Sequence, residues 1–335
     1  MSHCGNGLRK SELIFCYYKV MKSILFLTLF ILFTFKVNAS KIYTSDITNF
    51  WEAYDSIQTT NLHNQKIKFI SDLYIKKASD GLKDFIEAMD YSAEEWVKTI
   101  DDCPKYWKSV RPQTLSIVRL ANDLETISKN FKSIYPEFND PEIYFTIGCL
   151  RSGGTTTKGK ILIGLEIGAA DSSTDASELN SWLKKMFKVN SGIIQLVAHE
   201  MNHTQQIESP DTLFIPSLLS QSILEGSCDF IAELILKKQY VALHTNYGLA
   251  HTKTLLSKFY KNKDQISFDR WLYNGNRSKL KPADLGYYIG YEICKTYYES
   301  SEDKSIAIKE IIQLDWNDKN KLMSMLDLTI KKYEL

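Results

Sequence analysis

The chain has few cysteines, no excess of basic residues and no apolar segment long enough to cross a membrane. Of its six cysteines, the four after the N-terminal region (Cys103, Cys149, Cys228 and Cys294) are far apart and lack the paired C-x-x-C spacing of a zinc ribbon. Lys and Arg number 41 against 40 Asp and Glu, which does not favour a nucleic-acid partner. The apolar run Ile24–Phe35 is too short to span a bilayer. These absences leave the class of ordinary globular proteins.

The N-terminus has the layout of a secretory signal. Lys22 precedes the apolar run, and Val37-Asn38-Ala39 ends it with small residues that a signal peptidase accepts. We therefore expect residues 1–39 to be a signal-peptide region whose true start is Met21, and the protein to be periplasmic or secreted. No cysteine stands at the cleavage point, so we expect no stable membrane anchor after cleavage. The alternative is an uncleaved N-terminal anchor.

The region after the signal divides into a helical part, residues 40–135, and a second part, residues 136–335. Five segments of the first part have helical patterning: Phe50–Ile57, Gln65–Lys77, Gly81–Met89, Ala93–Ile100 and Thr114–Phe131. No catalytic constellation occurs among them. We expect these helices to form one wall of the same folding unit.

Two segments rich in β-branched and aromatic residues begin the second part. Glu142–Cys149 and Lys160–Ile167 are predicted strands, and the glycine-rich connection between them predicts a hairpin. Gly153 and Gly154 lack the spacing of a phosphate loop, so we interpret them as turn residues. The edge of such a hairpin can hold an extended peptide by main-chain pairing, or it can simply be covered.

The central motif of the sequence is His199-Glu200-x-x-His203. On a helix over Ile193–Ile207, residues four apart lie one above the other, so both imidazoles can reach one zinc ion. Glu200 falls in the apolar arc of that helix, where a lone carboxylate is costly. A general base at the edge of a metal cleft explains its position. The alternative is an amphipathic helix with a solvated histidine pair.

A third ligand is available on the next predicted helix, Ser217–Tyr240. Glu225 and Asp229 are four apart on a narrow polar stripe, so Glu225 can complete the zinc site while Asp229 orients a histidine. The alternative is a solvated stripe on an amphipathic helix. Cys228 could ligate zinc in principle, but it points off the stripe.

With these residues the chain resembles the gluzincin class of zinc metallopeptidases. The wider set, from Ser152-Gly153-Gly154-Thr155 to Gly286-Tyr287-Tyr288-Ile289-Gly290-Tyr291, is similar to a family of predicted bacterial zinc-dependent proteases that includes gliding-motility lipoproteins. The likeness covers roughly residues 135–298. It implies a zincin-like α+β fold, dominated by helices, with a small sheet beside the motif helix.

The last predicted helix with a chemical role is Asp284–Ser300. Gly286 and Gly290 let a neighbouring helix approach, and Tyr287 or Tyr291 could donate a hydrogen bond to an oxyanion. His244 and His251 are other possible donors, and core packing is the alternative for each of these residues.

We therefore predict an exported zinc metallopeptidase that acts on a peptide or protein, with Zn²⁺ held by His199, His203 and Glu225. Glu200 is the general base, and Gly153 and Gly154 contact the substrate. The alternative is a non-catalytic zincin-like protein of the cell envelope that binds a partner in its cleft.

Overall fold

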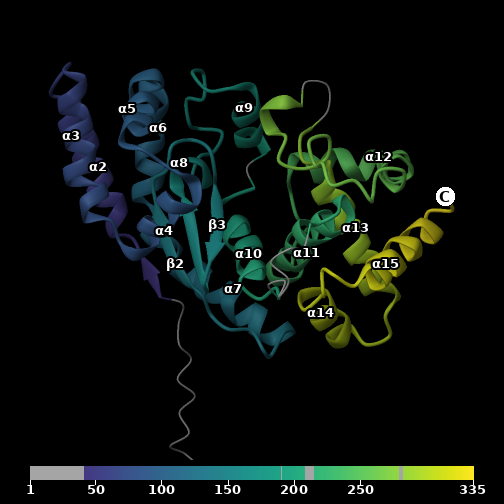
Figure 1. Ribbon diagram of the computed structural model, residues 1–335. Coiled ribbons are helices and arrows are strands. Elements are labelled where there is room, and N and C mark those ends of the chain that lie inside the picture. Colours follow the sequence, from purple (N-terminus) through teal and green to yellow (C-terminus); the bar gives the residue numbers. More distant parts are fainter. Residues whose placement is uncertain (1–40, 190, 208–214, 279–281) are drawn as a thin grey trace, which may run out of the picture. The chain divides into compact units, whose positions relative to one another are not determined.

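A four-stranded mixed sheet packs beside the motif helix in the computed structural model (Figure 1). Its strands are β1 (Ile42–Tyr43), β2 (Glu142–Thr146), β3 (Gly154–Thr157) and β4 (Lys160–Gly164), in the order β1-β2-β4-β3. The structure describes residues 41–189, 191–207, 215–278 and 282–335, all within one unit, Ala39–Leu335. The signal-peptide prediction lies outside the described residues. Within them, every helix is too short or too polar to cross a bilayer.

The pairing of the strands corrects the hairpin prediction. β2 and β4 run parallel, with Ile143 opposite Ile161, so they are not the two arms of a hairpin. The hairpin is instead β3–β4, because the threonine-rich segment after Gly153 is itself a strand. Lys158 and Gly159 form its two-residue loop, and both have a positive φ, as hairpin turns of the primed types require. β3 is consequently an edge strand.

The helices before β2 build a layer rich in buried aromatic residues, which meets the sheet through α2 and α4. They are α2 (Ser45–Ile57), α3 (His63–Leu73), η1 (Ile75–Lys77), α4 (Asp80–Met89), α5 (Ala93–Asp102), α6 (Pro104–Leu115), η2 (Ile117–Leu120) and α7 (Ala121–Ile134). Tyr74 and Trp96 are fully buried, and each donates a side-chain hydrogen bond to the carbonyl oxygen of Ile147, just after β2. These bonds tie the helical wall to the strand that leads toward the site.

Two parts of the helix prediction were wrong. The helix expected over Thr114–Phe131 is split: α6 continues through Pro112 to Leu115, and α7 begins at Ala121 after a short 3-10 turn. The helix α12 (Leu243–Tyr260) was not predicted, because its apolar positions do not follow one clear stripe and its backbone is kinked at His251.

The remaining elements surround the motif helix. They are α8 (Leu165–Gly168), α9 (Ser181–Val189), α10 (Ile193–His203), α11 (Leu218–Leu236), η3 (Gly275–Arg277), α13 (Leu285–Ser300), α14 (Lys304–Ile312) and α15 (Lys319–Lys332). α11 lies between α10 and α13 and packs on both. A Cβ at Gly290 would overlap the Ser222 carbonyl, and one at Gly226 would overlap the Tyr291 backbone nitrogen. The close helix approach expected at Gly290 is therefore present.

The fold class is confirmed as helix-dominated α+β with a small sheet beside the motif helix. The four cysteines of the described part, Cys103, Cys149, Cys228 and Cys294, are free thiols.

Candidate metal centre

Helix α10 brings the two motif histidines together on the side that faces α11. Val197, Ala198 and Met201 are fully buried and fix the opposite side of the helix in the core. His199 and His203 then stand one turn apart, with ring centroids 4.9 Å apart and Nε2 atoms 3.2 Å apart. Both Nε2 atoms are therefore close enough to share one ion.

The other ring nitrogen of each histidine has an acceptor. Asp229 Oδ1 lies 2.8 Å from Nδ1 of His199, and Gln206 Oε1 lies 2.8 Å from Nδ1 of His203. The Gln206 amide nitrogen donates to the Leu224 carbonyl at 2.9 Å, so its oxygen is the atom that turns to the histidine. A proton held at Nδ1 leaves Nε2 as the atom that can bind a cation.

Glu225 on α11 completes a triangle with these two nitrogens. Its Oε2 lies 3.3 Å from His203 Nε2 and 3.7 Å from His199 Nε2. Ligands that share a tetrahedral zinc ion at about 2.0–2.1 Å are about 3.3 Å apart. The three atoms therefore already have the mutual spacing of a zinc ligand set.

The charges around this triangle favour a cation. Burial raises the pKa of the Glu225 carboxyl, but the nearby histidines lower it further, so the pKa lies below its usual value. For His199 burial acts in the opposite direction and lowers the pKa, yet the bonds with Asp229 and Glu225 raise the pKa of this histidine well above its usual value. The carboxylates thus stabilise positive charge at this point, whether as a proton or as a metal ion.

A thiol also lies near the histidine pair. His199, His203 and Cys228 offer ligand atoms that are all within 4.8 Å of one another. The sulfur accepts a hydrogen bond from Asn202 Nδ2 at 3.2 Å and one from Gln206 Nε2 at 3.4 Å. Two chemically different groups, a carboxylate and a thiol, are therefore candidates for the third position.

Asp229 connects the histidine pair to a third histidine. Its Oδ1 bonds with His199, and its Oδ2 lies 2.8 Å from Nε2 of His244, in the first turn of α12. The carboxylate is fully buried. Burial raises its pKa, but the charge of His244 and the bond with His199 lower the value to about 2. Asp229 is thus ionised and fixes two imidazole rings from different helices.

Glu200 lies against the edge strand. The residue is 6% exposed, and an added Cβ at Gly154 would be 2.8 Å from its Oε1. Gly154 is therefore glycine because Glu200 occupies the space of a side chain, and not because it forms a turn as predicted. Burial raises the pKa of Glu200, while the charges of His199 and His203 oppose this rise. A raised pKa suits a group that accepts and returns a proton near neutral pH.

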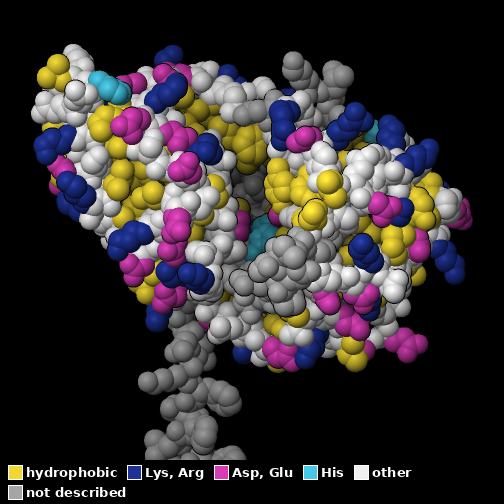
Figure 2. Space-filling view, in the orientation of Figure 1, with side chains coloured by type: hydrophobic (Ala, Val, Ile, Leu, Met, Phe, Trp, Pro, Cys, Tyr) yellow, Lys and Arg dark blue, Asp and Glu magenta, His cyan; other side chains and the backbone are white. Residues whose placement is uncertain are grey.

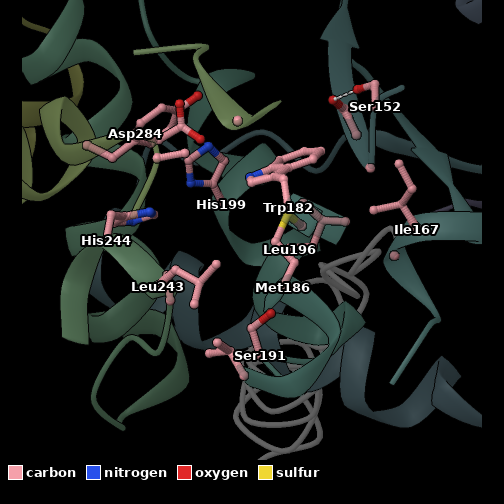
Figure 3. A pocket seen from close by; sticks show the side chains of 18 of the residues that line it. Ser152, Ile167, Trp182, Met186, Ser191, Leu196, His199, Leu243, His244 and Asp284 are labelled. Carbon is pink, nitrogen blue, oxygen red and sulfur yellow. Dashed lines mark hydrogen bonds between the residues drawn. The ribbon is translucent and has the colours of Figure 1, made fainter. Parts of the chain in front are cut away.

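These groups open into a cavity of about 580 Å³ that is lined by both polar and apolar residues. In Figure 2 a histidine is visible at the bottom of a hollow with hydrophobic side chains on its rim. Figure 3 shows His199, His244 and Asp284 on one side of this pocket and Ile167 on the other, with Trp182 and Leu196 between them. Gly153 and Gly154 line it as well.

The two predicted tyrosines lie in different surroundings. Tyr287 lines the cavity, and its ring centroid is 6.2 Å from that of His199. The Tyr291 hydroxyl instead donates to Glu233 Oε2 at 2.8 Å and accepts from Lys295 at 3.0 Å. His251 stacks on Tyr247 and is exposed, so His244 is the histidine of α12 that reaches the cavity.

A third tyrosine, Tyr273, was not predicted to belong to the site. Its hydroxyl donates a hydrogen bond of 2.5 Å to Glu225 Oε1. Tyr273 lies in an irregular segment that is 48 residues from Glu225, so no helical or strand spacing could relate the two. Gln206 is three residues after His203, which is the spacing of neighbours on a helix, so its contact with that histidine could have been proposed from the sequence.

The part of the chain that forms this centre matches the model of one protein family. Residues 180–317 match the model of a family described as "Predicted Zn-dependent protease (DUF2268)". The match includes α10, α11 and the segment of Tyr273, and it leaves out the sheet and the N-terminal helices. Comparisons with curated proteins and with solved structures find no match. The metal-site region is therefore similar to predicted zinc-dependent proteases.

Proposed function

We propose that this protein is a zinc metallopeptidase of the gluzincin type, and that it is exported. The observation that carries the proposal is the triangle of His199 Nε2, His203 Nε2 and Glu225 Oε2, whose edges of 3.2–3.7 Å suit one zinc ion. The family match supports the same reaction. The apolar run after Lys22 supports export.

Glu225 is a better third ligand than Cys228. Its oxygen lies within 3.7 Å of both histidine nitrogens, whereas Cys228 belongs only to a wider group with a limit of 4.8 Å. Two amide groups already donate to the sulfur, and the thiol contacts the Leu224 carbonyl. Cys228 therefore serves the packing between α10 and α11.

Zinc, when bound, supplies positive charge that polarises a peptide carbonyl and makes a water molecule more acidic. The carboxylate of Glu200 accepts a proton from that water as its oxygen adds to the carbonyl carbon. Glu200 then returns the proton to the amine nitrogen as the peptide bond breaks, so its own charge is restored. Asp229 and Gln206 hold the histidine rings throughout.

The developing negative charge on the carbonyl oxygen needs a hydrogen-bond donor in the cavity. Tyr287 is placed for this role, because it lines the cavity beside His199. Tyr291, which already donates to Glu233, is the less suitable of the two tyrosines.

A peptide substrate fits the edge of β3. Gly153 and Gly154 lie at the start of this strand and line the cavity, so an extended chain can pair there with its scissile bond near Glu200. The partly exposed side chains of Trp182 and Leu196 then receive apolar parts of the substrate.

The test compares wild type with Glu200→Gln. We expect both to bind one equivalent of zinc, and only the wild type to cleave a mixture of random peptides. Cleavage by the variant at the wild-type rate would contradict the role of Glu200. Zinc binding without cleavage of any peptide by the wild type would favour a non-catalytic protein that binds a partner in this cavity.

A further inference from the structure

Tyr273 engages the oxygen of Glu225 that does not face the histidines. Its hydroxyl lies 2.5 Å from Glu225 Oε1, while Oε2 faces the two Nε2 atoms. Gln221 Nε2 donates to the same hydroxyl at 2.6 Å. The hydroxyl oxygen accepts a hydrogen bond from the Gln221 amide. The single hydroxyl hydrogen of Tyr273 therefore points to the Glu225 carboxylate.

The backbone at Tyr273 is held in an unfavourable conformation. Its φ is 53°, in the left-handed region that a non-glycine residue rarely adopts. Asn274 and Asp284 bond reciprocally through their backbone N–H groups and side-chain oxygens, at 3.0 and 2.9 Å. Arg277 donates to the Tyr273 carbonyl at 2.9 Å. These contacts hold the backbone that follows the Tyr273 ring.

Burial does not explain why this strain is kept. Tyr273 is 49% exposed, although its ring has an edge contact with Tyr287 at a centroid distance of 6.2 Å. A half-exposed ring gains only part of the free energy of burial. The specific contact that the backbone conformation secures is the hydroxyl on Glu225.

We propose that Tyr273 is a positioning residue for the metal centre, whose hydroxyl holds Glu225 Oε1 so that Oε2 alone is presented to the ion. This inference rests on the proposed function, because it takes Glu225 as the third ligand. A carboxylate fixed in this way binds through one oxygen, and the ligand triangle is formed before the ion arrives.

Tyr273→Phe tests the proposal, because it removes the hydroxyl and keeps the ring. We expect the zinc dissociation constant, measured by competition with a chromophoric chelator, to rise about 10- to 100-fold. We also expect the visible absorption of the cobalt-substituted protein to change, because the released carboxylate can bind through two oxygens. Tyr260→Phe is the control, since Tyr260 is a partly exposed tyrosine outside the cavity lining and should leave both readouts unchanged.

Unchanged zinc affinity and an unchanged cobalt spectrum in Tyr273→Phe would overturn the proposal for Tyr273. The proposed function would still stand in that case, provided that the wild-type protein binds zinc through its histidines. A wild type that binds no zinc would instead refute the proposed function.

Gln221→Leu is the second variant, should Tyr273→Phe not fold. It removes the bond that orients the hydroxyl, and a smaller loss of affinity in the same direction is expected; equal affinity would overturn the proposal.

Discussion

Gly154 offers a way to disturb the general base without touching a metal ligand. It starts the edge strand β3, and a Cβ added there would lie 2.8 Å from Glu200 Oε1 and 3.2 Å from both Cγ and Cδ. Gly154→Ala therefore forces the Glu200 side chain away from its place, because strand β3 is fixed by its pairing with β4.

The size of the effect follows from this distance. An ordinary contact between carbon and oxygen is about 3.4 Å, so the carboxylate must move by about 0.6 Å. A displacement of about 1 Å in a reacting group can lower the rate about 100-fold. We therefore expect kcat to fall on the order of tenfold in Gly154→Ala. Zinc affinity should be unchanged, since Glu200 is not a ligand.

A double-mutant cycle separates this cause from a general disturbance of the strand. Glu200→Asp shortens the side chain by one carbon, so it withdraws the oxygen that lies 2.8 Å from the new Cβ and keeps only an atom at the Cγ position, 3.2 Å away. We expect Gly154→Ala to lower kcat about tenfold in the wild type and clearly less in the Glu200→Asp background, with peptide cleavage measured under saturating substrate. Equal losses in both backgrounds would refute the reasoning, because they would show that Gly154 acts independently of Glu200.

Two further predictions concern buried carboxylates. Asp229→Asn weakens the hydrogen bonds that orient the rings of His199 and His244. We expect zinc affinity, measured by chelator competition, to fall about 10- to 100-fold. Wild-type affinity in the variant would contradict the role of Asp229 in orienting His199. Glu166 is fully buried, and burial raises its pKa from 4.5 to about 7 although the Gly148 and Leu150 N–H groups oppose the rise. The folded protein then keeps a proton that the unfolded chain releases, so the free energy of unfolding falls as pH rises from about 4.5 through 7, by up to about 3 kcal/mol. Urea unfolding of the metal-free protein at pH 5 and pH 8 should show a smaller fall in Glu166→Gln, and an identical fall would exclude Glu166 as its source.

The helical side of the site was predictable because helix geometry fixes which side chains meet. His199 and His203 are separated by four positions in the sequence of α10, and Glu225 and Asp229 by four positions in that of α11. Once the two helices pack, the relative positions of these side chains follow from spacing alone. The sequence also indicated a close helix approach at Gly290, but it could not show that the partner is α11, where Gly226 meets Gly290.

The sheet was predicted less well, because strand pairing is a long-range property. The segments of β2 and β4 were recognised by composition, but composition does not distinguish a parallel pair from a hairpin. The threonines after Gly154 looked like a connection because the two glycines dominated the local signal. Position 154 requires a glycine because the Glu200 side chain packs against it, and this contact between residues far apart in the sequence is visible only in the structure.

Contacts from irregular segments were beyond the reach of the sequence. Tyr273 reaches Glu225 from a segment without helical or strand periodicity, and its left-handed backbone is not encoded by a glycine. His244 could be suggested by residue type, but its bond with Asp229 depends on α12, a helix that the periodicity did not reveal.

X-ray absorption at the zinc edge of the wild-type protein tests the central claim most directly, because it reports the kind of atoms bound to the ion and their distances. We predict two histidine nitrogens and a carboxylate oxygen from Glu225 at about 2.0–2.1 Å, with no sulfur. A sulfur ligand at about 2.3 Å would place Cys228 in the third position and contradict the account.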